Sequence, residues 1–178
     1  MITENYKNLL RTNFIGSDQK MTTADGVSKY FSSETNKWCH PDYAPAKGLQ
    51  NTSSSYAANV SFGRGTTPAL ASDYTLEDMI LSSSYSLIKP TAYRRIVNAE
   101  GKTLYTATYT LRNLEETELV INEIGLFMWA YTYTSSGYSS GTLSKMLVDR
   151  TVLEEPLIIP PGEIRALTYN LVFDLNFE

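Results

Sequence analysis

The sequence is poor in the residues that most often carry chemistry, with one cysteine and one histidine among 178 residues. A single thiol forms no disulfide within the chain and offers no thiolate cluster for zinc or an iron–sulfur centre. One histidine also excludes a histidine-rich metal site, so we expect neither a metal nor another cofactor. Apolar runs of membrane-spanning length are missing, and residues 1–14 lack the apolar core of a secretion signal. We therefore expect no membrane partner.

Positive charge is also scarce. The chain has 15 Lys and Arg against 19 Asp and Glu, which gives a net charge of −4. Proteins that bind the phosphate backbone need a concentrated basic surface, so we expect no nucleic-acid partner. By contrast, hydrophobic residues make up 42% of the chain and 13 residues are tyrosines. Tyrosine suits half-buried strands and protein interfaces, and the length suits one independently folding domain.

Alternation of apolar and polar residues with a period of two predicts several β-strands and almost no helix. Turn residues separate these strands at regular spacing, which favours an all-β antiparallel β-sandwich. Pro160-Pro161-Gly162 fits a tight type II turn, and we expect a hairpin-like reversal there before the last strand. One strand, Leu119 to Tyr133, is apolar on both faces, so we expect a second sheet on one face and a neighbouring subunit on the other. The predicted strands are Tyr56 to Phe62, Tyr85 to Ile88, Thr103 to Asn113, Leu119 to Tyr133, Lys145 to Leu153, Leu157 to Ile159 and Ile164 to Phe177.

Two segments carry weaker helix patterns. Ser72 to Ile80 begins with an N-cap residue followed by acidic residues, so we predict one short helix there, and Glu4 to Leu10 is a second short candidate. The rest of residues 1–55 is polar with few apolar clusters. We expect an extended N-terminal arm over residues 1–55 that partners order, and a β-sandwich domain over residues 56–178.

Two short motifs resemble catalytic or ligand-binding sequences without meeting their requirements. Cys39 and His40 are adjacent, and neighbouring side chains of an extended segment point in opposite directions, which argues against a nucleophile pair. The turn Gly63-Arg64-Gly65 lacks the Gly-Lys-Ser/Thr ending of a phosphate-binding loop. We expect instead a turn that needs positive φ at its glycines. We therefore expect no enzyme.

Glu123 is the exception among the carboxylates, because it lies inside the most apolar strand. A buried carboxylate needs a partner, so we predict that Glu123 pairs with Arg150 or with backbone donors of a neighbouring strand, in a structural role. The other acidic clusters are expected to keep loop ends soluble, although a carboxylate-based polysaccharide hydrolase stays an alternative. Those clusters are Glu115, Glu116, Glu118, Glu154 and Glu155.

Aromatic side chains supply a further alternative. Exposed tyrosines and tryptophans stack on sugar rings, and a glycan-binding module that attaches to a receptor or host surface would use such a platform. We expect most aromatic residues to fill the core and interfaces instead. The candidate platform consists of Trp38, Tyr43, Tyr131, Tyr133 and Tyr138.

Three pieces of the sequence, in order, resemble a pattern of small structural proteins of tailed bacteriophage virions, such as fibre, neck and baseplate components. A Gly-x-Gly-Thr-x-Pro turn precedes a Ser/Thr-Asp-x-x-Leu stretch, then a Glu-Ile-Gly-Leu-Phe strand, and finally a strand with an Arg that leads to a Pro-Gly turn. The resemblance covers about residues 56–178. The matching pieces are Val60 to Pro68 with Ser72 to Leu76, Asn122 to Phe127, and Leu147 to Thr151 with Pro161 to Glu163.

This resemblance implies a homo-oligomer, as a ring or trimer, that contacts other virion proteins, and it carries over no catalytic residue. In this chain Arg64 replaces a small residue in the first turn, which predicts a specific contact at that corner. We expect a non-enzymatic subunit of the neck, tail or fibre apparatus, assembled in the host cytoplasm into the virion, with a capsid decoration protein as an alternative. The expected structural or interface residues are Glu123, Arg150, Gly63, Arg64, Gly65, Asp73, Gly125, Pro161 and Gly162.

Overall fold

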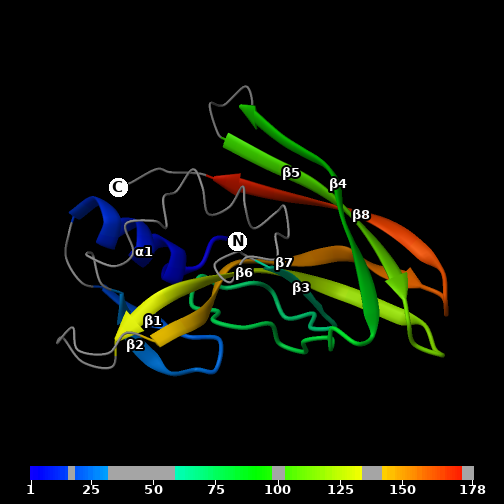
Figure 1. The fold of residues 1–178 in the computed structure, drawn as a ribbon, viewed down its shortest axis with the longest axis horizontal. Coiled ribbons are helices and arrows are strands. Elements are labelled where there is room, and N and C mark those ends of the chain that lie inside the picture. Colours follow the sequence, from blue (N-terminus) through cyan, green and yellow to red (C-terminus); the bar gives the residue numbers. More distant parts are fainter. Residues whose placement is uncertain (16–18, 32–58, 98–102, 134–141, 174–178) are drawn as a thin grey trace.

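The computed structural model describes residues 1–15, 19–31, 59–97, 103–133 and 142–173 (Figure 1). The described residues form one helix and eight strands, and all strand pairs are antiparallel. No helix in these ranges is long and apolar enough to span a bilayer. The elements are α1 (Glu4–Ile15), β1 (Gln19–Thr22), β2 (Ser28–Phe31), β3 (Asn59–Gly63), β4 (Tyr85–Val97), β5 (Thr103–Asn113), β6 (Leu119–Tyr133), β7 (Thr142–Ile159) and β8 (Ile164–Phe173).

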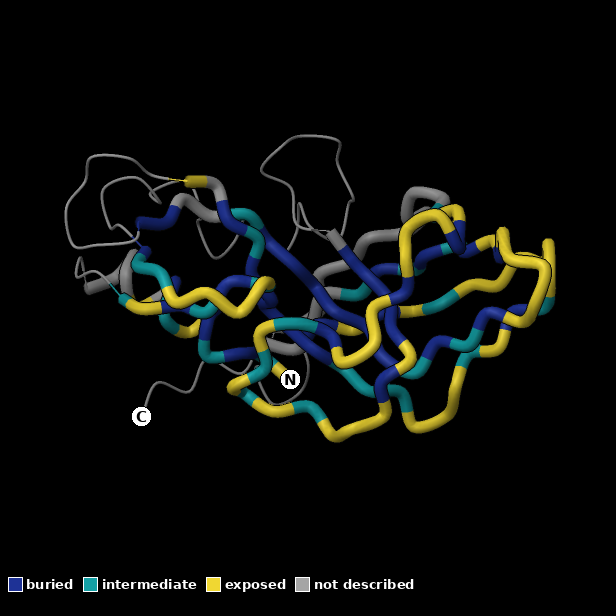
Figure 2. The backbone as a smooth tube through the Cα atoms, turned by 90° about the horizontal axis from the view of Figure 1, so that it is seen from below, coloured by how far each residue is buried: buried dark blue, intermediate teal, exposed yellow. Residues whose placement is uncertain are grey.

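The strands form two sheets. The larger sheet has the order β1-β2-β6-β3, with β7 paired to β6, and the smaller sheet has the order β4-β5-β8. Figure 1 shows β4, β5 and β8 lying over the long strands β6 and β7. One hydrophobic core draws on both sheets, because Tyr109 and Leu171 of the smaller sheet belong to the same buried cluster as Ile124 and Val148 of the larger sheet. Figure 2 shows the buried positions running through the middle of the molecule.

Two of the strands predicted for the second half of the chain are confirmed to the residue. β5 and β6 begin and end at the predicted residues. Along β5, Ala107, Tyr109 and Leu111 are fully buried while Thr108 and Thr110 between them are partly exposed, as alternation requires. Along β8, Tyr169 is buried and its neighbours Thr168 and Asn170 are exposed.

A change of face occurs in the middle of β6. Leu119 and Ile121 point into the main core, but so do Ile124 and Leu126, which have the opposite parity. The pairing with β7 shifts its register between Ile121 and Glu123, and such a bulge moves the following side chains to the other face. Glu123 is thereby placed on the face of β6 that points away from the main core.

The N-terminal segment differs from the predicted extended arm. α1 buries Tyr6 and Leu9 in the main core, and the β1–β2 hairpin buries Met21 and Phe31. β2 also pairs with β6, so residues 19–31 are part of the larger sheet. The prediction is wrong for residues 1–15 and 19–31, because these single, widely spaced apolar side chains are enough to attach the segment. Residues 32–55 of the predicted arm lie outside the described residues.

Three local predictions also need correction. Ser72 to Ile80 forms turns and one isolated bridge rather than a helix. β7 is a single strand where two were predicted. The predicted tight turn is confirmed, since Gly162 has φ of 72° and the Glu163 N–H donates to the Pro160 carbonyl at 3.1 Å. It forms no hairpin, however, because β7 ends in one sheet and β8 begins in the other.

Candidate functional site: an arginine clamp beneath a surface loop

The centre of the site is a buried ion pair between two neighbouring strands. Arg150 of β7 donates through Nε to Oε2 of Glu123 in β6, at 2.7 Å. Glu123 is fully buried and Arg150 is 3% exposed. The predicted pairing of Glu123 with Arg150 is therefore confirmed.

The same guanidinium holds a surface loop. Its Nη1 donates to Oδ2 of Asp73 at 2.8 Å, and its Nη2 donates to Oε2 of Glu77 at 3.4 Å. One cation thus binds three carboxylates, two of which come from the segment between β3 and β4. We call Arg150 with Asp73, Glu77 and Glu123 the arginine clamp, and residues 64–80 the clamped loop.

Backbone N–H groups of the clamped loop supply further hydrogen bonds to the buried carboxylate. Glu123 accepts hydrogen bonds from the N–H groups of Gly65 at 3.2 Å, Glu77 at 3.3 Å and Asp78 at 3.0 Å. In a helix over this segment, the last two N–H groups would donate to carbonyls one turn earlier. Because they donate to Glu123 instead, the predicted helix does not form. The predicted arginine is therefore joined by backbone donors, but these belong to the clamped loop and not, as was predicted, to a neighbouring strand.

Asp73 and Glu77, whose acidic side chains suggested a helix N-terminus, accept hydrogen bonds from other residues of the loop. The Glu77 carboxylate accepts from the Thr67 N–H at 3.0 Å and from the Thr67 hydroxyl at 2.9 Å. Asp73 accepts from the Leu70 N–H at 2.8 Å. These carboxylates therefore fold the loop onto itself as well as onto Arg150.

The glycines of the Gly63-Arg64-Gly65 turn are required for close approach. A Cβ atom on Gly65 would lie 2.7 Å from Oε1 of Glu123 and 2.5 Å from Cβ of Glu77, and one on Gly63 would clash with the same Glu123 oxygen. The predicted positive φ at these two glycines is wrong, since neither has a positive φ. Only glycine leaves room for the buried carboxylate beneath this turn.

Gly125 likewise leaves room for side chains that pack closely beside the clamp. A Cβ atom there would lie 2.8 Å from Cδ2 of Leu76 and 3.1 Å from Cδ1 of Leu147. Leu76 of the loop packs with Phe127 and Leu147 in a small buried cluster. The outer face of β6 is therefore covered here by the chain's own loop, where a neighbouring subunit was expected.

The electrostatics of the clamp favour fixed charges. Hydrogen bonds from the Thr67 backbone and hydroxyl, together with the charge of Arg150, lower the pKa of Glu77. Burial opposes the charge of Arg150, but its bonds to Asp73 and Glu123 outweigh burial and raise the pKa of the guanidinium. Glu77 and Arg150 thus keep their charges at neutral pH, and Glu123 is fully buried beneath the clamped loop.

A second buried polar link joins the two sheets, and no local pattern in the sequence predicts it. The hydroxyl of Tyr169 in β8 donates to Oδ2 of Asp149 in β7, and both residues are buried. Burial and the charge of Asp149 raise the pKa of Tyr169 well above its usual value. The neighbouring aspartate and arginine of β7 therefore point to different partners, one across the core and one to the surface loop.

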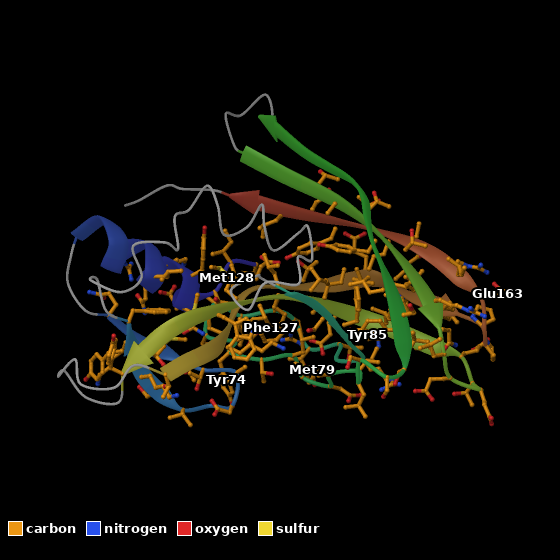
Figure 3. All side chains as sticks on the ribbon, viewed as in Figure 1. Tyr74, Met79, Tyr85, Phe127, Met128 and Glu163 are labelled. Atoms are coloured by element: carbon orange, nitrogen blue, oxygen red, sulfur yellow. The ribbon has the colours of Figure 1, made fainter. Side chains whose placement is uncertain are left out.

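The other predicted residues do not join the clamp. Arg64 is exposed, and its backbone pairs with the Asp78 carbonyl and the Asn122 side chain. Pro161 and Gly162 form the turn next to Glu163, which lies at one end of the molecule in Figure 3, whereas Phe127 lies near the middle. Glu115, Glu116 and Glu118 lie between β5 and β6 and are exposed, as expected for a soluble loop end. Glu154 and Glu155 are also exposed, but they lie within β7, so the loop end expected there does not form.

The residues named for nucleophilic chemistry and for most of the aromatic platform, Trp38, Cys39, His40, Tyr43 and Tyr138, lie outside the described residues. The side chain of Tyr131 is likewise outside, and Tyr133 is buried. In the described ranges, no group of three or more His, Cys, Asp or Glu side chains could hold a metal ion. No known protein family, curated protein or solved structure matches this chain.

Proposed function

We propose that this chain is a non-enzymatic structural subunit of a tailed-bacteriophage particle, in its neck, tail or fibre apparatus. The observation that supports this proposal is the convergence of the three sequence pieces that resemble virion proteins. Residues 60–76 supply Asp73, residues 122–127 supply Glu123 and residues 147–151 supply Arg150. Pieces that are distant in the sequence thus share one task, which is to fix a surface loop on a sheet.

The clamped loop has the properties of a contact surface. Its backbone is fixed by the buried clamp, while Leu70, Tyr74 and Met79 are exposed, and Leu81 follows directly with 72% of its surface exposed. Apolar side chains on a rigid frame suit binding to another protein, because little conformational entropy is lost on association. Figure 3 shows Tyr74 and Met79 on the same side of the larger sheet.

We further propose that the two sheets form a β-sandwich and that the subunit assembles as a ring or trimer with other virion proteins. The shared core of the two sheets supports the sandwich. Assembly would take place in the host cytoplasm. Residues 1–15 and 19–31 fold against their own sheets, so this proposal assigns them no role in locking neighbouring subunits. A capsid decoration protein would use the same fold at another position.

The glycan-binding alternative predicts an exposed aromatic platform. Tyr133, one of its proposed members, is only 8% exposed and pairs across from Tyr30 in the larger sheet. A sugar ring stacks on an accessible aromatic face, so this residue does not serve such a platform.

The proposed function is tested by locating the chain in particles made by the genome that encodes it. Particles purified on a density gradient would be analysed by quantitative mass spectrometry and by immunogold labelling with an antibody against the chain. We expect a fixed copy number relative to other virion proteins and label at the neck, tail or fibres. If the chain stayed in the soluble fraction while particles were complete and infectious, the proposal would be wrong.

A further inference from the structure

Edge strands carry unpaired backbone donors and acceptors, and proteins protect them by covering them, shortening them or interrupting them with bulges. The larger sheet protects its edges in these ways. β1 has four residues only. β7 is covered by the chain start, because the Thr3 N–H donates to the Val148 carbonyl at 2.9 Å and the Arg150 N–H donates to the Met1 carbonyl at 3.1 Å.

β3 is covered by the end of the clamped loop. Gly63 forms a bridge with Met79, and the Ile80 N–H donates to the Phe62 carbonyl at 2.9 Å. The clamp thus protects an edge as well as a face of the larger sheet. The smaller sheet contrasts with this arrangement, since its two edges are the long strands β4 and β8.

The two edges of the smaller sheet differ from each other. β4 loses its register between Ile88 and Ala92, and this interruption contains Lys89 and Pro90. Proline has no N–H, and a bulge disturbs the regular row of backbone groups that a new strand would need. β4 is therefore a poor template for another strand.

β8 has none of these protections. Its pairing with β5 is unbroken over all ten residues, and its sequence contains neither proline nor glycine. Its only charged residue is Arg165, near one end. In the part of the chain that the structure describes, no strand pairs with the other edge of β8. This edge is the regular, neutral template to which strands add.

We propose that the outer edge of β8 pairs antiparallel with β8 of a second copy, about a two-fold axis near its centre. This inference rests on the proposed function as an assembly subunit and names a two-fold contact that joins two chains, or two rings or trimers of chains, in addition to the contacts within a ring or trimer. The smaller sheets of the two copies would then form one continuous sheet. A second copy fits this edge without charge repulsion, because the two-fold axis separates the two Arg165 side chains by roughly 20–27 Å, at the strand rise of about 3.4 Å per residue.

Side chains on the exposed face already show the pairing that the second copy would continue. The Thr106 hydroxyl donates to Oδ1 of Asn170 at 2.9 Å, and the hydroxyls of Thr108 and Thr168 lie 3.3 Å apart. These pairs form two rows across β5 and β8. With the axis at Thr168, that residue meets its own copy, and with the axis at Tyr169, Thr168 meets Asn170 of the partner. With the axis at Tyr169, both rows continue into polar groups of the partner, whereas with the axis at Thr168 only the Thr108–Thr168 row does so, because Asn170 then meets Ala166.

The test is the mass of the full chain in solution, by light scattering after size exclusion over a range of concentrations. The edge variant Thr168→Lys/Asn170→Lys places lysine opposite lysine at either position of the axis, and like charges directly opposite each other destabilise strand pairs. The control variant Thr106→Lys/Thr108→Lys puts the same charges in the same rows, one strand further in. A third variant, Thr168→Glu/Asn170→Glu, restores opposite charges when it is mixed with the lysine edge variant.

We expect a wild-type oligomer with an even number of chains, at least twice the 19.9 kDa of one chain. The lysine edge variant should halve its mass, the control variant should keep it, and the mixture of lysine and glutamate edge variants should recover it. A wild-type monomer at all concentrations, or an oligomer whose mass the edge variants leave unchanged, would overturn the proposed edge. Detection of the chain in purified particles would still stand in either case, so failure of the edge and failure of the virion role are distinguishable.

Discussion

The two sheets of this protein differ in how their faces and edges are covered. The larger sheet is closed by its own chain, with a loop over the outer face of β6 and short backbone bridges on the edges of β3 and β7. The smaller sheet exposes a hydroxyl-rich face and leaves the edge of β8 unpaired among the described residues. The difference indicates a division of tasks, in which one half of the molecule fixes its own shape and the other half is able to be extended.

The half of the molecule built on the larger sheet contains a buried ion pair at a position that apolar side chains could also fill. Replacing a buried ion pair by well-packed apolar residues is often neutral or stabilising, so the clamp is weak evidence for extra stability. What the clamp provides is a defined position of the loop on the sheet, because the three carboxylates and the guanidinium have to meet at one place. The following substitutions test this comparison, from the largest expected effect to the smallest.

Arg150→Met should have the largest effect, because it leaves the fully buried Glu123 without its counter-ion. We expect a loss of about 3–5 kcal/mol in the free energy of unfolding. The measurement is equilibrium unfolding in urea. Arg165→Met is the matched control, since Arg165 pairs with Glu163 at the surface and should contribute less than about 1 kcal/mol. Equal losses from the two variants would contradict the buried role of Arg150.

Glu123→Gln keeps the shape of the side chain and removes its charge. The hydrogen bonds from Arg150 and from the loop N–H groups become bonds to a neutral group, so we expect a loss of about 2–3 kcal/mol. Unfolding in urea measures it, and limited proteolysis should show faster cleavage within the clamped loop. An unchanged free energy of unfolding together with unchanged assembly would remove the structural role assigned to Glu123.

Gly125→Ala tests the close packing of the closed face. The added methyl group meets Leu76 and Leu147, and overpacking of this kind costs about 1–3 kcal/mol. Thr168→Ala on the open sheet removes an exposed hydroxyl and should change the free energy of unfolding by less than about 0.5 kcal/mol. Thermal unfolding of the two variants, measured in parallel, compares their losses of stability. A larger loss from Thr168→Ala than from Gly125→Ala would contradict the difference between the two sheets.

Gly162→Ala addresses the connection between the sheets. A Cβ atom at this position meets nothing within 4 Å, so space is available, but φ of 72° disfavours a side chain. We expect a loss of about 1 kcal/mol from backbone conformation alone. Gly162→Asn should recover part of this loss in the same urea measurement, because asparagine tolerates the left-handed region better than alanine.

The smallest effect should appear in acid. The pKa of Glu77 is lowered in the folded chain, so its bonds contribute stability above the usual carboxyl value of 4.5 and lose it as pH falls through the lower folded value. The free energy of unfolding should therefore decline in this range less steeply for Glu77→Gln than for the wild type. Thr67→Val, which removes one donor to Glu77, should give an intermediate slope, and identical slopes in all three would contradict the pairing.

The sequence was informative where a strand has one consistent pattern. β5 and β6 were predicted to the residue, because alternation in β5 and continuous hydrophobicity in β6 leave few other structures. The partner of Glu123 was also predictable, since an apolar strand demands one. The convergence of Asp73 and Glu77 on the same arginine was not, because long-range contacts leave no local signal.

The failures have physical causes that are visible in the same residues. Ser72 to Ile80 carries valid helix signals, but its N–H groups donate to Glu123, which is distant in the sequence. The N-terminal segment was expected to be an arm because its apolar residues are sparse, yet Tyr6 and Leu9 are fully covered. The Pro161-Gly162 turn was located correctly, but local sequence does not say which sheet the next strand enters.

The clamp also sets an order of events in folding. β6 and β7 are consecutive strands, so their pairing closes only a short connection, whereas the clamp joins them to a loop 45 to 77 positions earlier in the chain. Closing such a loop costs entropy before any bond rewards it. The clamped loop is therefore expected to dock after the β6–β7 hairpin has formed, and a clamp that forms late governs how fast the native chain opens rather than how fast it folds.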